Sequence, residues 1–250
     1  MTRQILTLAG ALAFSMTLFA EKTTHRLELG DFSELVVVDG VKVNHVCNAD
    51  SAGIAVFSCE PDKASQITFN NNGGKLTIQT TAETEPYRDM PTVTVYSSTL
   101  SRAENSGDSL LCVNISAPVK TLKIHQMGNG AVKVNGIDAE QLELAFAAGK
   151  GTMEVAGRAD KAKIRNVGTG TINATDLTAD DVNCFIFGTG DITLGTSDKV
   201  KIYGAGNGKV IYDHAPGKIT NRSIGVKALS LAEMAKKDKD KAEILTAKNK

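Results

Sequence analysis

Apolar and polar residues alternate over short runs along most of this chain, and five of the runs directly follow a Gly-x-Gly turn. Alternation with a period of two places the apolar side chains on one face of a β-strand. The fourth residue after the second glycine of each turn is apolar or aromatic: Val134, Val155, Ala174, Leu194 and Tyr212. The pattern therefore predicts five equivalent strands, each with one face directed into a core.

A second alternating run begins about ten to twelve residues after the second glycine in each of the first four copies. Matching positions in these runs hold Leu144, Ile164, Cys184 and Ile202. The second glycines recur every 18 to 21 residues, a period typical of solenoids. Stacked coils keep such a period because like residues lie over like, whereas an antiparallel meander has no reason to keep it. The sequence therefore predicts an all-β fold, a right-handed parallel β-helix of about six or seven coils.

The turn glycines are predicted to be structural. Glycine allows a positive φ and lets the next coil approach without a side chain in the way. A nucleotide-binding loop would need a helix after the glycines, and here a short strand follows each turn, so we expect no cofactor. Including a degenerate first copy at residues 106–108, the predicted turn glycines are Gly107, Gly130, Gly151, Gly170, Gly190 and Gly208.

The regular repeat occupies residues 106–225, and a different pattern precedes it. Residues 21–105 contain strand-like runs separated by Asn, Asp, Gly and Pro. Residues 48–53 and 70–74 favour hairpin loops. We therefore expect residues 21–105 to form an antiparallel or mixed β cap at one end of the stack.

The two ends of the chain differ from the repeat. Residues 1–20 carry Arg3 followed by an apolar run, the order of a secretory signal, with cleavage expected after Ala20. This predicts export to the periplasm or cell surface of a Gram-negative bacterium, with no stable membrane span after signal removal; an uncleaved anchor is the alternative. Residues 226–250 are rich in Lys, Glu and Ala, and Ser230 with Glu233 fits a capping box, which predicts a charged helical tail.

Composition excludes some partners and leaves the cysteine chemistry open. The chain holds 28 basic and 28 acidic residues, so nucleic acid is not an expected partner. Cys184 falls in an apolar column and is predicted to be a buried thiol without a partner. Cys47 and Cys59 flank the first predicted hairpin and are candidates for a disulfide, and the pairing of Cys47, Cys59 and Cys112 stays open.

No cluster of residues suggests catalysis or metal binding. The histidines lack metal-ligand spacing, and we expect each on the surface: His25, His45, His125 and His214. Two columns of predicted outward positions both mix charges, as a solvated sheet does. The first holds Lys133, Glu154, Asn173, Thr193 and Ile211, and the second holds Glu143, Lys163, Asn183 and Lys201. A polysaccharide-acting enzyme needs convergent carboxylates, so we expect no enzyme.

A carbohydrate-binding module on a β-helix face is the alternative function. Sugar platforms use aromatic stacking, and this chain has no Trp and four Tyr: Tyr87, Tyr96, Tyr203 and Tyr212. Tyr203 and Tyr212 are the candidate ligand contacts. Their number is small for a glycan platform, which favours a structural or interaction role with an envelope protein or glycan as partner.

The run from Phe32 to Val43, taken with the repeated Gly-x-Gly turns, resembles the head GIN domain family of auto-transporter adhesins. The resemblance covers about residues 30–225, although the family's Ser-Gly-Ser-Gly corners are replaced here by turns with Thr, Asn or Lys. It implies a β-helix fold, a cell-envelope setting and an adhesin-like role. It implies no catalytic residues. We therefore expect a non-enzymatic exported protein of adhesin-like type.

Overall fold

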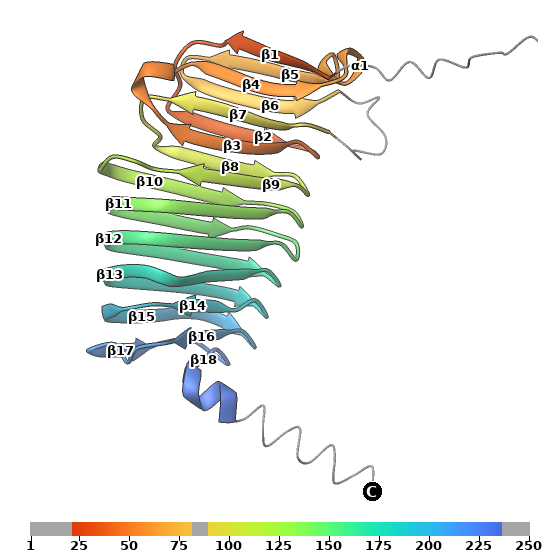
Figure 1. Cartoon of the computed structure of the whole chain (residues 1–250). Helices are drawn as coiled ribbons and strands as arrows, with labels where there is room; N and C mark the ends of the chain where they lie inside the picture. The colour runs from red at the N-terminus through yellow and green to blue at the C-terminus, as the bar shows by residue number, and fades with distance from the viewer. Residues whose placement is uncertain (1–21, 82–89, 237–250) are drawn as a thin grey trace, which may run out of the picture.

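The strands of this protein stack along one axis into a rod, with the N-terminal strands at one end and a short helix at the other (Figure 1). The computed structural model describes residues 22–81 and 90–236. Equivalent strands of successive coils pair in parallel along the rod. The structure thus confirms the predicted parallel β-helix, with about six solenoid turns.

Each regular coil contributes to two sheets, and its longest strands bend through the corner between them. The regular coils contain β10 (Val119–Gln126), β11 (Ala131–Phe146), β12 (Thr152–Gly168), β13 (Thr171–Gly188), β14 (Ile192–Leu194), β15 (Ser197–Gly206), β16 (Lys209–Tyr212), β17 (Lys218–Asn221) and β18 (Lys227–Ser230). The second half of β11 pairs with β10, in what we call the first sheet. Its first half pairs with β9 (Leu110–Asn114), in what we call the second sheet.

The two sheets enclose a core of stacked apolar columns. A column of the first sheet holds residues that pair in succession, Leu144, Ile164, Cys184 and Ile202. The second sheet contains the predicted column of Val134, Val155, Ala174, Leu194 and Tyr212. The first-sheet members are fully buried, and burying a side chain of this size contributes about 1.5–3 kcal/mol. The coils are therefore held together by like packing on like.

The two glycines of each corner have different roles. In the second copy, Gly149 has a φ of 99°, in the left-handed region that favours glycine. Gly151 has no such φ, but a Cβ added to it would lie 2.3 Å from the carbonyl oxygen of Gly130 one coil earlier. The first glycine thus turns the chain and the second permits the coils to approach.

The N-terminal region mixes parallel and antiparallel pairs, as predicted. It contains β1 (Thr23–Glu28), β2 (Glu34–Val38), β3 (Lys42–Cys47), the 3-10 turn η1 (Ala49–Ser51), β4 (Ile54–Cys59), α1 (Pro61–Ala64), β5 (Ile67–Asn72), β6 (Lys75–Thr80), β7 (Thr92–Ser97), β8 (Arg102–Ser106) and β9. β4 pairs antiparallel with β1 and β7, and β5 with β6. β2 lies parallel between β6 and β8, and β3 lies parallel between β7 and β9. One coil is therefore inserted between coils that follow it in sequence.

This insertion corrects one predicted hairpin. Residues 48–53 do not close a hairpin, because β7 lies between β3 and β4 and pairs with both. The short-range turn pattern does not reveal a strand that arrives about 40 residues later. The hairpin predicted at residues 70–74 is confirmed, since Asn72 pairs with Lys75 across Gly73 and Gly74.

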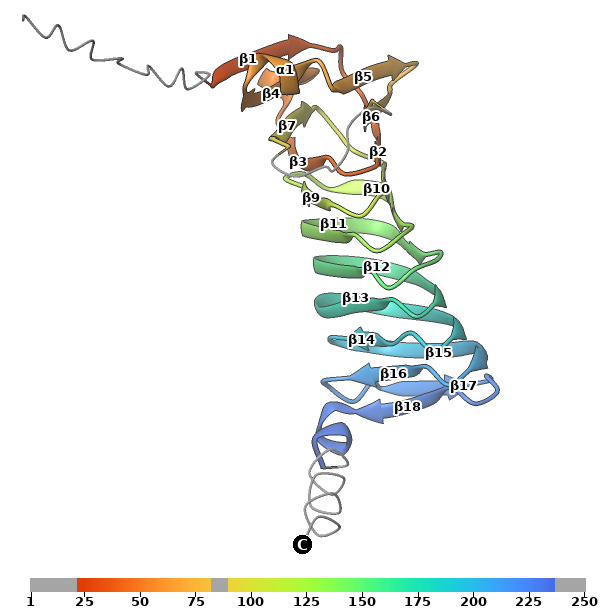
Figure 2. The same cartoon turned by 90° about the vertical axis from the view of Figure 1, so that its right-hand side faces the viewer.

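The C-terminal tail begins as part of the rod. β18 pairs in parallel with β16, so residues 227–230 complete a coil, and residues 231–236 are helical. The predicted capping box is present: Ser230 N–H donates to Glu233 Oε2 at 2.8 Å, and Glu233 N–H donates to Ser230 Oγ at 3.2 Å. Figure 2 shows this helix directly below the last strands. The predicted signal segment and residues 237–250 lie outside the described residues.

All four cysteines are free thiols. Cys184 is fully buried as predicted, and burial raises its pKa to about 12. Cys47 ends β3 and Cys59 ends β4, but these strands run in opposite directions on either side of β7. The two cysteines therefore lie toward opposite ends of β7, so the candidate Cys47–Cys59 disulfide is not formed.

Candidate functional site

The outer surface of the first sheet carries a concentration of positive charge. Alternate residues of β12, β13, β15 and β17 point outward and align from coil to coil, three in each coil; in the last coil the third residue, Arg222, directly follows the end of β17. We call these twelve residues the basic face: Lys161, Lys163, Arg165, Asp181, Asn183, Phe185, Lys199, Lys201, Tyr203, Lys218, Thr220 and Arg222. Seven are Lys or Arg and one is acidic, although the whole chain has no net charge.

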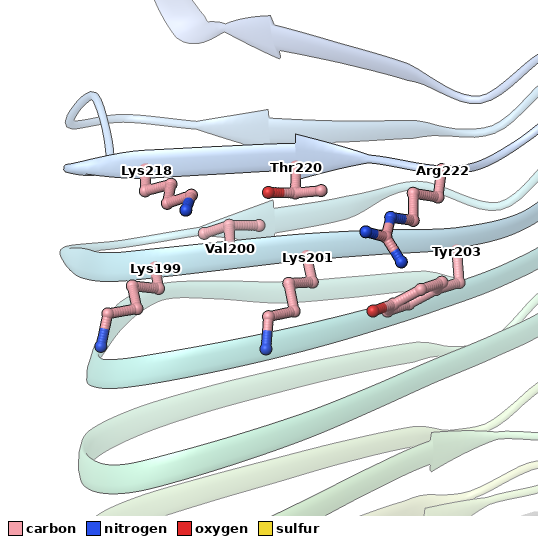
Figure 3. Close-up of a pocket in the computed structure, with 7 residues that line it drawn as sticks. All are labelled: Lys199, Val200, Lys201, Tyr203, Lys218, Thr220 and Arg222. Atoms are coloured by element: carbon pink, nitrogen blue, oxygen red, sulfur yellow. The ribbon is translucent and has the colours of Figure 1, made fainter.

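The basic face is hollowed at its C-terminal end. A depression of about 440 Å³ lies over β15 and β17 and is lined by Lys199, Val200, Lys201, Tyr203, Lys218, Thr220 and Arg222. Figure 3 shows these side chains, with the guanidinium of Arg222 directed toward the ring of Tyr203. Four cations and a phenol therefore line one shallow site that can accept anionic groups.

Few acids neutralise this charge. Lys199 Nζ lies 3.7 Å from Asp181 Oδ1, and Lys163 Nζ lies 3.5 Å from Glu143 Oε1 of the neighbouring β11. Within residues 22–81 and 90–236, the other five cations of the basic face make no ion pair with a carboxylate. Their mutual repulsion is relieved when an anion binds, which favours a polyanionic ligand.

The aromatic residues of the face stack along the coil direction. The rings of Phe185 and Tyr203 are 5.3 Å apart with an angle of 18° between their planes. Each ring therefore covers one face of the other, which leaves less ring surface for a sugar. Tyr212 lies in the inward column of the second sheet, so the structure does not bring the two candidate contacts, Tyr203 and Tyr212, together. Tyr96 lies on β7, and Tyr87 is outside the described residues.

The sequence interpretation missed the basic face because it compared one outward column per sheet. The column of Glu143, Lys163, Asn183 and Lys201 does mix charges. Its neighbours two residues away on the same strands include further cations, Lys161, Arg165 and Lys199. Comparing all outward positions of each run would have found the signal. Ile211, predicted to point outward, is instead buried.

His45 is the histidine that departs most from its predicted surface position, because it is fully buried. Its Nε2 lies 2.8 Å from Ser97 Oγ, and Ser97 Oγ donates to the carbonyl oxygen of Thr99 at 2.9 Å. His45 therefore donates to the serine, and burial lowers its pKa to about 4. A serine that donates elsewhere and is itself fully buried is not placed as a nucleophile, so this pair stabilises the core.

His125 is half-buried and also departs from the predicted surface position. Its Nδ1 lies 3.4 Å from Arg102 Nη2. Burial and this neighbouring cation lower its pKa. His214 is exposed as expected. Over the described part of the chain, no group of three or more His, Cys, Asp or Glu is arranged to hold a metal ion.

Within residues 22–81 and 90–236, no helix has the length and hydropathy of a membrane span. The fold and the basic face define a parallel β-helix that displays a flat, charged surface. Residues 31–216 match the family described as "Putative auto-transporter adhesin, head GIN domain". The chain belongs to this family, which confirms the resemblance seen in the sequence.

Several crystal structures share the fold. A "putative adhesin" from Bacteroides fragilis has a TM-score of 0.71 and 18% identity, covering 84% of this chain and 96% of that one. A "putative adhesin" from Parabacteroides distasonis has a TM-score of 0.64 and 18% identity, covering 85% and 98%. A "putative lipid binding protein" from the same species has a TM-score of 0.63 and 18% identity, covering 84% and 96%. No functionally curated protein matches the chain in sequence.

Proposed function

We propose that this chain is an exported, non-enzymatic contact protein of adhesin type that binds an anionic partner of the cell envelope through the basic face. The observation that carries the proposal is the ratio of seven cations to one acid over twelve adjacent outward positions. Coils about 4.8 Å apart repeat these charges along the rod. A flat, periodic array of cations suits an extended partner that carries many negative groups.

The acids that balance these cations lie elsewhere on the rod, so positive and negative charges are separated on its surface. Exposed carboxylates recur at the start of successive first-sheet strands: Glu140, Asp160, Asp180 and Asp198. Each follows a residue that pairs from coil to coil at the corner of the solenoid. The corner is therefore acidic and the adjoining face basic. An anionic partner is drawn to one side of the molecule, so the neutral total charge does not argue against electrostatic binding.

The arrangement of the basic face favours binding over catalysis. Hydrolysis of a glycosidic bond uses two carboxyl groups on opposite sides of the bond. Among the twelve residues of the basic face, Asp181 is the single carboxylate, and Lys199 lies 3.7 Å from it. An array of cations with one paired carboxylate can hold a polyanion. It lacks the second carboxyl group that glycosidic hydrolysis uses, so one acid and one base are not both present.

A carbohydrate-binding role is the second candidate, and Tyr203 favours it. The phenol lies in the depression beside Lys201 and Arg222, where a sugar with carboxylate, sulfate or phosphate groups would meet both ring and charge. Because Phe185 covers one face of this ring, charge rather than stacking would supply most of the affinity. This predicts selectivity for anionic over neutral glycans.

The test compares immobilised anionic and neutral polysaccharides, reading both retention of the exported chain and cleavage of the polymer. We expect retention on the anionic polymers that weakens steeply with added salt, because exposed charges are screened within about 8 Å at physiological ionic strength. The double variant Lys201→Glu/Arg222→Glu should bind at least about tenfold more weakly, since each reversal replaces attraction by repulsion. No cleavage is expected.

The matched control is Lys150→Glu/Lys227→Glu, which makes the same change in net charge at exposed positions off the basic face. It should keep nearly full retention. Equal losses in both double variants would show that net charge alone drives binding and would contradict the proposed face. Turnover of any polymer would contradict the non-enzymatic role.

A further inference from the structure

A line of exposed apolar residues runs along the edge of the first sheet, just before the Gly-x-Gly corners. We call it the apolar ridge: Met127, Ala147, Val167, Phe187, Ala205 and Ile224. Val167, Phe187, Ala205 and Ile224 pair in register, and Met127 and Ala147 each follow the last paired residue of their own strands. All six positions are exposed or at the margin of exposure, and none carries a polar side chain.

The exposure of the large members is substantial. Met127 is 46% exposed, Phe187 48% and Ile224 79%. Five coil spacings of about 4.8 Å make the apolar ridge roughly 24 Å long. Single exposed apolar residues need no explanation, but an aligned series on six successive coils marks a surface that contacts something apolar.

The apolar ridge and the basic face point to the same side of the rod. Each ridge residue follows an outward residue by two positions, as Val167 follows Arg165 and Phe187 follows Phe185. These strands are still paired at the ridge position, since Val167 pairs with Phe187 and Phe187 with Ala205. Residues two apart on a paired strand share one face of the sheet. The rod thus presents an apolar edge bordered by the basic face, whose nearest column holds Arg165, Phe185, Tyr203 and Arg222.

The charges decide what covers the apolar ridge. A second copy docked ridge to ridge would bring two sets of seven cations together, which is unfavourable. An uncharged apolar partner would leave those cations without counter-charges. An anionic lipid surface satisfies both parts at once, because its acyl layer accepts apolar side chains and its head groups neutralise Lys and Arg.

We infer that the apolar ridge and the basic face together dock this protein on an anionic lipid surface, with the rod axis parallel to that surface. Phe187 and the other large ridge side chains enter the boundary between head groups and acyl chains. Lys163, Lys201 and Arg222 lie over the head-group phosphates. This inference rests on the proposed function, and it identifies the anionic partner as a lipid layer.

The absence of tryptophan from the chain permits a direct test. Phe187→Trp places a single tryptophan on the apolar ridge, and Thr193→Trp places one on the outer side of the second sheet as a matched control. The full exported chain is mixed with vesicles of phosphatidylglycerol and phosphatidylcholine, or of phosphatidylcholine alone. With the anionic vesicles we expect the tryptophan emission of the Phe187→Trp variant to shift to the blue and that of the Thr193→Trp variant to stay unchanged. Sedimentation with the vesicles gives the partition coefficient.

Variants then separate the two parts of the surface. Val167→Ser/Phe187→Ser should weaken vesicle partition at least about tenfold, because it removes apolar area from the inserted edge, and should leave retention on anionic polysaccharide unchanged. Lys201→Glu/Arg222→Glu should weaken both. Circular dichroism spectra unchanged from those of the parent chain check that these substitutions do not unfold it.

Three results would overturn the inference. Retention on anionic polysaccharide without vesicle binding would leave the proposed function standing and refute the lipid surface. Failure to bind either would refute both proposals. Loss of a dimer in Val167→Ser/Phe187→Ser, with no vesicle binding by the parent chain, would show that a second copy covers the apolar ridge.

Discussion

In the regular coils, strands pair with their equivalents one coil before and one coil after, whereas in the N-terminal region β2 pairs with strands far along the chain. Val37 of β2 pairs with Ile78 and with Asn105, about 40 and 70 residues later. Nearest-neighbour stacking needs little loop closure, so the regular coils can form by propagation. The inserted coil requires two long-range closures, which slow assembly. The same two-strand unit therefore assembles through pairing between successive coils in one region and through long-range pairing in the other.

The cores of the two regions also differ in chemistry. The regular coils stack residues such as Leu144, Ile164 and Cys184, none of which changes charge in the acid range. The N-terminal region buries His45 beside Ser97, with its Nδ1 lacking a hydrogen-bond partner. Burial opposes the charged imidazolium. Acid should therefore act on the N-terminal region before it acts on the regular coils.

The largest expected effect breaks the regular coils at their centre. Ile164→Asp places an unpaired carboxylate in the fully buried column, at a cost of about 4 kcal/mol or more, and should abolish soluble folding. Lys163→Asp, one residue away on the outer surface, should stay soluble with a native circular dichroism spectrum. Soluble, native-like Ile164→Asp would show that the coils tolerate local disruption and that stacking is not cooperative.

A smaller effect is expected where the two regions meet. A Cβ on Gly107 would lie 1.9 Å from the carbonyl oxygen of Asp39, in the turn between β2 and β3. Gly107→Ala should therefore displace the inserted coil and cost about 3 kcal/mol in urea unfolding, with faster hydrogen exchange in β2 and β3 than in β12. Asp108→Ala is the control; it loses hydrogen bonds from Asn129 and should cost about 1 kcal/mol or less. Equal hydrogen exchange in β2, β3 and β12 of the Gly107→Ala variant would contradict a local displacement of the inserted coil.

The smallest expected effect is a loss of folding stability at low pH, and it tests the difference in core chemistry between the two regions. The pKa of His45 is lowered from 6.5 to about 4 in the folded state, so the unfolded state binds this proton first. Stability is complete above about pH 6.5 and is lost as the pH falls toward 4, by roughly 2 kcal/mol between pH 7 and pH 5. His45→Gln should flatten this slope in urea unfolding. An unchanged slope would assign the acid sensitivity to another group.

Much of the regular fold could be predicted from the chain because its information is local. The column containing Ile164 and Cys184 follows from alternation and a constant period, and the hairpin at Gly73 and Gly74 follows from turn chemistry. The position of β7 between β3 and β4 could not be predicted this way, because alternation shows which face of a strand is buried and not which strand lies beside it.

The same distinction between local pattern and tertiary arrangement applies to the basic face and the apolar ridge. Each residue of the basic face and the apolar ridge is visible in the sequence, yet Arg165 and Arg222 are separated by more than 50 residues, and their union depends on register. The coil, its core columns and its glycine corners can be read from the chain alone, because these depend on neighbours and on period. That seven cations and six apolar residues share one side emerges only in the folded rod, because stacking turns distant positions into adjacent ones at intervals of about 4.8 Å.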